Sequence, residues 1–192
     1  GTLMSGWTLQ SNVVQGNATA MDTLKVATAH TTTLSGPGTL FNVQFQVADV
    51  RHPATSPLTF SQVLFNTGSV PASVTHGSLK LVGNDGSISS VPSTIIPRWP
   101  VAVTVSDIDE NRNPGVAEVR SVQVSNGSQT ETLNVTETGL STGVFTGSIS
   151  TVFSLGSTSG DGIVQAKAGD VIAFAFDDSL DSAGNTVLRQ DL

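Results

Sequence analysis

The chain has 192 residues, of which 38% are hydrophobic and only 12% are charged, and its net charge is −7. With only eight Lys and Arg residues in the whole chain, the composition argues against a nucleic-acid-binding function. The absence of cysteine excludes disulfides, thiolate zinc sites and cysteine nucleophiles, and no apolar run approaches the roughly 20 residues of a membrane span.

The first part of the chain predicts short β-strands separated by Gly and Pro. The expected strands cover Trp7–Val13, Leu24–Ala29, Gly38–Val47, Leu58–Phe65 and Ser78–Val82. The pattern is clearest at residues 38–47, where Phe41 and Val43 alternate with Asn42 and Gln44. Such a period of two is typical of a strand with one buried and one solvated face. No segment shows a sustained helical period.

Three of these segments, in this order, carry a resemblance to a known family. Residues 34–47, 56–66 and 76–81 contain a Gly-x-Leu strand, a Ser-Pro-Leu strand and a closing Gly-Ser-Leu strand. This order resembles the later half of a cohesin-type module, a jelly-roll β-sandwich found in prokaryotic surface proteins. The resemblance implies a cohesin-like domain at residues 1–84 that lacks N-terminal strands. An incomplete sandwich exposes strand edges, so we expect strand addition by a copy of the chain or by another surface protein.

The next segment predicts a domain boundary. Residues 85–97 are rich in Gly, Ser and Pro, which predicts a linker before a second domain at residues 98–192. The strands expected in that domain cover residues 101–105, 119–124, 131–135, 169–176 and 186–192. Between two of them, Asn126-Gly127 predicts a hairpin with a type I′ turn, in which both residues have positive φ.

A turn-rich motif lies at the centre of the second half. Residues 136–147 read Thr-Glu-Thr-Gly-Leu-Ser-Thr-Gly-Val-Phe-Thr-Gly, between an acidic loop that begins at Asp107 and another that begins at Asp177. This combination is similar to Ig-like β-sandwich repeats of secreted bacterial and archaeal proteins of adhesin or cell-envelope type. The resemblance implies a structural repeat to which no enzyme chemistry is attached.

The two acidic loops are candidates for calcium binding. The candidate ligands are Asp107, Asp109, Asn111, Asn113, Glu118, Asp177, Asp178 and Asp181. The first five lie at relative positions 1, 3, 5, 7 and 12, the ligand spacing of a calcium loop. Arg112 replaces the glycine that a helical calcium hand needs, so only the ligand spacing supports the metal. Asp and Asn are also favoured turn residues, and plain turn chemistry is the alternative.

Other chemistry has weaker support. The three histidines lack metal-ligand spacing, and no Gly-x-Ser-x-Gly nucleophile motif is present. Glycosylation sequons start at Asn17, Asn126 and Asn134. Two Trp residues and no Tyr leave little aromatic surface for stacking sugars, which weakens a hydrolase or a glycan-binding function.

The sequence therefore predicts an all-β chain of two β-sandwich domains in tandem, jelly-roll and Ig-like. The expected function is a non-enzymatic, extracellular or cell-surface structural protein, part of a fibre, surface layer or adhesin. We expect it to assemble through strand and sandwich-face contacts, with calcium stiffening its loops. The alternative is a non-catalytic binding module that recognises a dockerin-like protein or a glycan. The start at Gly1 suggests a processed product or a fragment, and no signal peptide is recognised.

Overall fold

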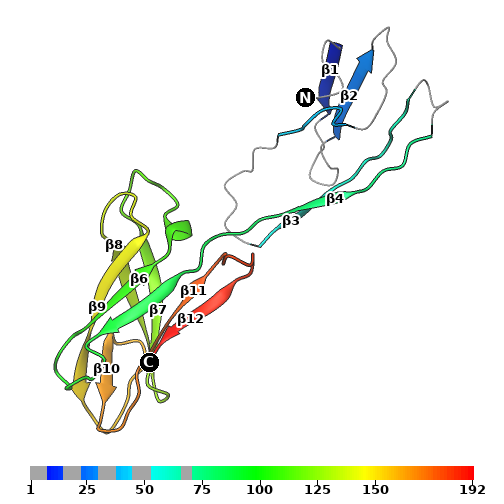
Figure 1. The fold of residues 1–192 in the computed structure, drawn as a ribbon. Coiled ribbons are helices and arrows are strands. Elements are labelled where there is room, and N and C mark those ends of the chain that lie inside the picture. The colour runs from blue at the N-terminus through cyan, green and yellow to red at the C-terminus, as the bar shows by residue number, and fades with distance from the viewer. Residues whose placement is uncertain (1–7, 15–22, 30–37, 45–52, 66–70) are drawn as a thin grey trace. The chain divides into compact units, whose positions relative to one another are not determined.

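The protein is described by a computed structural model that covers residues 8–14, 23–29, 38–44, 53–65 and 71–192 (Figure 1). The chain divides into two compact units, Gly1–Ala48 and Asp49–Leu192. In the first unit, strands β1 (Thr8–Val14) and β2 (Thr23–Ala29) form an antiparallel pair. All the regular structure described in this unit is therefore a two-stranded hairpin.

The second unit begins with a two-stranded antiparallel ribbon. It consists of β3 (Thr55–Leu58) and β4 (Gly77–Lys80). Every side chain of these strands except Leu58 is exposed. Beyond the paired residues, Phe60 is 52% exposed. The ribbon therefore has backbone pairing but almost no buried side chains.

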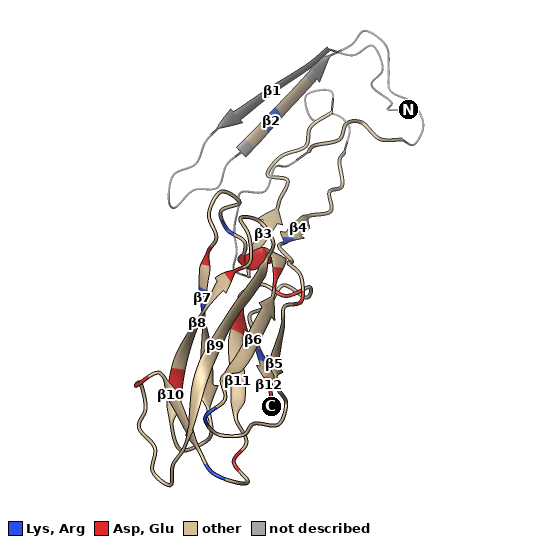
Figure 2. Ribbon diagram, turned by 90° about the vertical axis from the view of Figure 1, so that its left-hand side faces the viewer, with Lys and Arg blue, Asp and Glu red and all other residues tan. Residues whose placement is uncertain are grey.

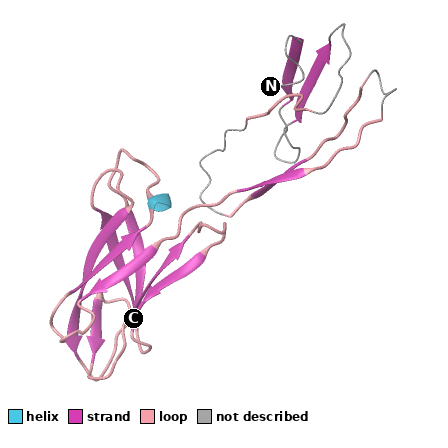
Figure 3. Cartoon of the chain, in the orientation of Figure 1, coloured by secondary structure: helices cyan, strands magenta, loops and turns pink. Residues whose placement is uncertain are grey.

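The remaining strands form one large sheet, seen in Figure 3 with the short helical turn η2 (Ile108–Glu110). Its strands are β5 (Ser87–Val91), β6 (Val101–Ser106), β7 (Val119–Ser125), β8 (Thr130–Glu137), β9 (Val144–Phe153), β10 (Ile163–Ala166), β11 (Ala173–Asp178) and β12 (Val187–Asp191). The order is β12-β11-β7-β8-β9-β6-β5, and β10 runs parallel beside β9. The prediction of an all-β fold is confirmed.

The two end strands of this sheet approach each other. The backbone N–H and the hydroxyl of Ser90 in β5 both donate to Asp191 Oδ2 in β12, each at 2.6 Å. The Asp191 side chain thus joins β5 and β12, which form no backbone ladder with each other in the described part of the chain. The sheet is nearly closed around a single core.

Alternation of apolar and polar residues explains why these segments form strands around that core. In β6, Val101, Val103 and Val105 are buried, whereas Ala102 is exposed. Because side chains of a strand alternate between its faces, this pattern places every second residue inside. The core consists of Val101, Val103, Val105, Val122, Val124, Leu133, Val135, Phe145, Ile149, Val164, Ala166, Ile172, Phe174 and Phe176.

The first half departs from the sequence predictions. Residues 38–44 form no strand, so the expectation for Gly38–Val47 is wrong over its described part, and residues 45–47 lie outside the described ranges. The expected strand at 58–65 shrinks to its first residue, which ends β3. A period of two supplies a face that could be buried, but a strand forms only where a neighbour pairs with it.

Two local predictions for the second half are modified. Residues 85–97, expected as a linker, include β5, which pairs with β6 in the sheet. The expected hairpin joins β7 to β8, but only Gly127 has positive φ, so the type I′ turn is wrong. Asn126 Oδ1 instead accepts hydrogen bonds from the N–H groups of Ser128 and Gln129, which stabilises a longer turn.

No helix in the described ranges is long and apolar enough to cross a membrane.

Candidate functional site

One end of the second unit gathers most of the predicted site residues, and we call it the acidic end. It comprises residues 83–86, 107–118, 138–143 and 177–186, and Figure 2 shows red acidic positions where β6 ends. The two predicted acidic loops meet here, because Ser179 Oγ donates to Glu110 Oε1 at 2.6 Å. Gly83 N also donates to Asp181 O at 2.9 Å. The structure thus brings together loops that are about 70 residues apart in the sequence.

Asp107 begins the first acidic loop and is only 3% exposed. Its Oδ1 accepts the N–H of Asp109 at 3.0 Å and caps η2. Its Oδ2 is buried and has no hydrogen-bond partner among the described residues. Burial raises the pKa of Asp107 to about 6, and the nearby carboxylates of Asp178 and Glu110 act in the same direction, against the Asp109 N–H. Asp107 is therefore a buried carboxyl group with one oxygen that accepts no hydrogen bond from the described residues.

The surroundings of Asp107 Oδ2 are tightly packed. A Cβ atom added to Gly86 would lie 2.7 Å from this oxygen and 2.7 Å from Phe176 Cζ. Glycine is needed at position 86 because no side chain fits between these groups. The space next to Asp107 Oδ2 is thus filled by backbone and an aromatic ring.

The remaining predicted ligands of the first loop bond within the acidic end. Asp109 accepts two hydrogen bonds from Asn84, from its backbone N at 2.5 Å and from its side-chain Nδ2 at 3.2 Å. Asn111 Nδ2 donates to Ser141 Oγ at 2.9 Å. Asn113 Oδ1 accepts the N–H of Gly115 at 3.0 Å in a turn. These side chains shape the loop and tie it to its neighbours.

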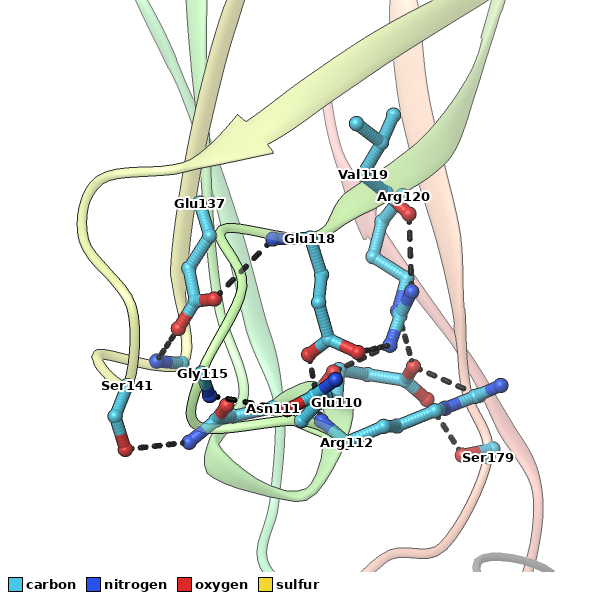
Figure 4. Close-up of polar contacts among 12 residues, drawn as sticks. Glu110, Asn111, Arg112, Gly115, Glu118, Val119, Arg120, Glu137, Ser141 and Ser179 are labelled. Atoms are coloured by element: carbon cyan, nitrogen blue, oxygen red, sulfur yellow. Dashed lines mark hydrogen bonds and ion pairs between the residues drawn. The ribbon is translucent and has the colours of Figure 1, made fainter.

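An ion-pair network stabilises the same loop (Figure 4). Glu110, which is 3% exposed, lies 2.5 Å from Arg120 Nε and 2.9 Å from Arg112 Nη2. Glu118 accepts the N–H of Arg112 at 2.6 Å and lies 3.7 Å from Arg120 Nη2. Burial opposes ionisation of Glu110, but the hydroxyl of Ser179 and the two guanidinium groups outweigh it and lower the pKa. The arginines thus supply the positive charge that a buried carboxylate requires.

A second arginine-centred network joins the other acidic loop to the start of β5. Asp178 has no exposed surface, and its Oδ2 accepts hydrogen bonds from Arg189 at 2.7 and 3.0 Å and from Gly86 N at 2.9 Å. Arg189 Nη2 also lies 2.9 Å from Asp85 Oδ1. Asp178 Oδ1 accepts the N–H of Leu180 at 3.2 Å. This single carboxylate therefore connects three segments of the chain.

The two other predicted ligands of the second loop have different positions. Asp181 is largely buried, and its Oδ1 accepts the N–H groups of Ala183 at 2.9 Å and Asn185 at 2.7 Å. Asp177 lies on the outward face of β11 and is exposed. Asp181 therefore shapes the loop from inside, while Asp177 faces solvent.

The central motif of residues 136–147 owes its shape to Glu137, which is 5% exposed. Its Oε1 accepts the N–H groups of Thr142 at 2.6 Å and Gly143 at 2.9 Å, and its Oε2 accepts that of Glu118 at 3.4 Å. Burial opposes ionisation, but these N–H groups lower the pKa of Glu137 below its ordinary value. The motif thus folds around a carboxylate that sequence reasoning did not single out.

Gly143 is the position where this motif is most sensitive to substitution. It has φ of +62°, and an added Cβ would lie 2.7 Å from Ile108 Cα and 2.9 Å from Asp107 O.

Gly143→Ala is expected to lower the free energy of unfolding by about 3 kcal/mol, because the cost of backbone strain adds to the cost of overpacking. Gly127 has φ of +82° but nothing within 4 Å. Gly127→Ala is therefore a matched control, and it is expected to lower the free energy of unfolding in urea by about 1 kcal/mol. Equal losses of stability in the two variants would contradict the close approach of Gly143 to Ile108 and Asp107.

The fit of the acidic end to a metal ion can be judged from these contacts. Within the described ranges, no group of three or more His, Cys, Asp or Glu side chains is placed to hold a metal ion. The Glu110 and Asp178 carboxylates are bound by arginines, and Asp107 Oδ2 faces tightly packed atoms. Calcium requires about 6 to 8 oxygen ligands, which can also include backbone carbonyl, amide and water oxygens. Calcium binding stays a prediction.

Glu110, Arg120, Glu137 and Arg189 were missed by the search for metal-ligand spacing. A different signal in the sequence identifies Glu137, because it alternates in phase with the buried Leu133 and Val135 of β8. A carboxylate on the inward side of a strand must find hydrogen-bond donors there. Strand phase, rather than spacing along a loop, is the signal for Glu137, whereas Glu110 lies in the helical turn η2, where this signal does not apply.

Comparison with known proteins gives no family. No protein-family model matches the chain, and no curated protein matches it. The function must therefore be argued from the residues and their geometry.

Proposed function

We propose that the chain is an extracellular structural protein, a subunit or segment of a surface fibre, surface layer or adhesin. It assembles through β-strand and sandwich-face contacts and has no enzymatic activity. In this proposal the cohesin-like first half, residues 1–84, and the Ig-like second half are tandem sandwich domains. A partner, which is another copy or another surface protein, completes the first domain by adding strands.

The observation that carries this proposal is the β3–β4 ribbon. A two-stranded ribbon is at best marginally stable in water unless something covers it. Leu79 in β4 is 39% exposed, and Phe60 and Leu64 beyond β3 are 52% and 58% exposed. Strand addition would give the ribbon further backbone partners and cover apolar surface at the same time.

The outer face of the large sheet supports contacts between sandwich faces. Its exposed residues on β7, β8 and β9 include Ser121, Gln123, Thr132, Asn134, Thr146 and Ser148. None of these side chains is charged, so two such faces can approach without desolvating a charge. A hydroxyl-rich, uncharged face suits a packing surface better than a catalytic one.

The alternative is a non-catalytic binding module, favoured by the cohesin-like order of residues 34–81. Such a module would recognise a dockerin-like protein or a glycan and would stay monomeric until the ligand is added. A structural subunit needs no added partner. Self-association therefore distinguishes the two functions.

Electron microscopy of negatively stained protein tests the proposal. The full chain is examined over a rising concentration series, in calcium and in a chelator. Fibres or ordered oligomers are expected at high concentration. Isolated single-chain particles throughout the series would contradict the proposal and favour the binding module. Fibres in both calcium and chelator would show that assembly needs no calcium.

A further inference from the structure

The β3–β4 ribbon has two edges, and the phase of its hydrogen bonds shows which backbone groups each edge presents (Figure 1). Just outside the paired strands, the N–H of Leu81 donates to Ala54 O at 2.9 Å. Ser56 lies opposite Leu79 in the same register. Hydrogen-bonded and non-hydrogen-bonded residue pairs alternate along an antiparallel ribbon, so these two pairs are bonded and the alternate pairs point their N–H and C=O groups outward. The outward-pointing residues are Thr55 and Pro57 on β3 and Ser78 and Lys80 on β4.

The two edges differ because β3 contains a proline. Pro57 has no N–H, so at this position the β3 edge offers a C=O without the matching donor. Proline on an edge strand is a common device against strand addition. On the β4 edge, Ser78 and Lys80 present both N–H and C=O groups, and no strand in the described part of the chain pairs with this edge. The complete edge for strand addition is therefore that of β4.

The β4 edge is complementary to itself in the antiparallel direction. Two copies can pair so that Ser78 of each lies opposite Lys80 of the other, and every outward N–H then meets a C=O. Leu79, which is 39% exposed, then lies opposite Leu79 of the second copy in a non-hydrogen-bonded pair, where side chains come closest. Moving the register by two residues would either oppose the two Lys80 side chains, which repel each other, or place Leu79 opposite Gly77, without the apolar contact.

We propose that β4 of one copy pairs antiparallel with β4 of a second copy, with Leu79 at the two-fold axis. The two ribbons then form one sheet, and sheets of three or more strands reach the stability that a lone two-stranded ribbon lacks. Both copies use the same surface, so this contact closes on itself, and growth beyond a dimer uses the sandwich faces. The inference rests on the proposed function, since it names the edge and the partner strand through which a copy is added.

Engineered cysteines test this contact directly, because the chain has none of its own. Leu79→Cys places two thiols across the proposed two-fold axis, where Cβ atoms about 5 Å apart permit a disulfide after a small shift. Ser56→Cys is the matched control, because Ser56 lies opposite Leu79 within the ribbon and is also exposed. In the proposed sheet the two Ser56 side chains are three strand spacings apart, about 14 Å, which is too far for a disulfide.

Disulfide formation by the full chain is followed on non-reducing gels in a glutathione redox buffer. Leu79→Cys is expected to form the dimer at least about tenfold faster than Ser56→Cys, because pairing raises the effective concentration of the thiols. Adding Pro57→Thr to Ser56→Cys restores the missing N–H and completes the β3 edge, so this double variant is expected to form the dimer faster than Ser56→Cys alone. No gain in the double variant would overturn the blocking role of Pro57.

The crosslink reports this contact alone, whatever other contacts the assembly makes. Equal rates for Leu79→Cys and Ser56→Cys would overturn the pairing of β4 with β4. If the unmodified chain still forms fibres or oligomers in that case, the proposed function stands and its strand contact lies elsewhere. An unmodified chain that stays monomeric at all concentrations would overturn both the contact and the proposed function.

Discussion

Asp178→Asn is expected to lower the free energy of unfolding by about 3 kcal/mol, at the lower end of the range for breaking a buried ion pair. The carboxylate has no exposed surface, and its Oδ2 binds Arg189 and the N–H of Gly86. The substitution keeps the shape but removes the charge that offsets the guanidinium. Because Arg189 is 26% exposed, water limits the loss to the lower end of that range.

The neighbouring Asp177 provides the control. It is the same residue type and was predicted as a ligand of the same metal, but it lies on the exposed face of β11. Asp177→Asn is expected to change the free energy of unfolding by less than about 0.5 kcal/mol. Urea unfolding of both variants at neutral pH measures the difference. Equal losses would mean that the two carboxylates share one role, as in a common metal site.

Asp107→Asn is expected to change stability in a strongly pH-dependent way. The pKa of Asp107 is raised to about 6 in the folded chain, from an ordinary value of 3.8. Because the folded pKa is the higher one, ionised Asp107 destabilises the fold above about pH 6. This penalty decreases as the pH falls below 6 and is gone below 3.8. The shift corresponds to about 3 kcal/mol.

The difference in unfolding free energy between Asp107→Asn and the unmodified chain isolates this group. Between pH 8 and pH 4, the difference is expected to move by about 2.5 kcal/mol, with the variant relatively more stable at pH 8. Other carboxylates, such as Glu110 with its lowered pKa, lose stabilising charge as the pH falls, but they do so equally in both proteins. A pH-independent difference would contradict the buried, unpartnered carboxylate. A variant that loses stability only when calcium is present would support a metal ligand instead.

Strand phase predicted much of the large sheet. Val101, Val103 and Val105 alternate cleanly, and β6 forms where expected. The same rule separates Asp178 from Asp177, because only Asp178 is in phase with Phe174 and Phe176 on the inward side of β11. A buried aromatic pair followed in phase by an aspartate thus predicts a buried carboxylate.

Loop spacing predicted which residues gather at the acidic end but not what they bind. Spacing along a chain states which oxygens could converge, whereas their partners come from distant segments. Arg189 reaches Asp178 from the next strand, and Asn84 reaches Asp109 from the segment before β5. Neither partner is visible in the loops themselves, so the spacing could not show which side chains and backbone N–H groups bind these carboxylates.

The first half shows the limit of periodicity. Residues 38–44 have the clearest alternation in that half, yet they form no strand. Strand formation depends on a pairing partner and on a surface to cover, and neither is encoded in the segment itself. The strands β3 and β4 pair with each other, but among the described residues almost none of their side chains is buried, which is why we assign assembly to this part of the chain.

Self-association without an added partner is tested most directly by light scattering on a size-exclusion column, with the full chain in millimolar calcium. A structural subunit is expected to elute as a species, or a series of species, with a mass well above the 19.7 kDa of one chain. A single species at 19.7 kDa over the whole concentration range would contradict a self-assembling structural protein.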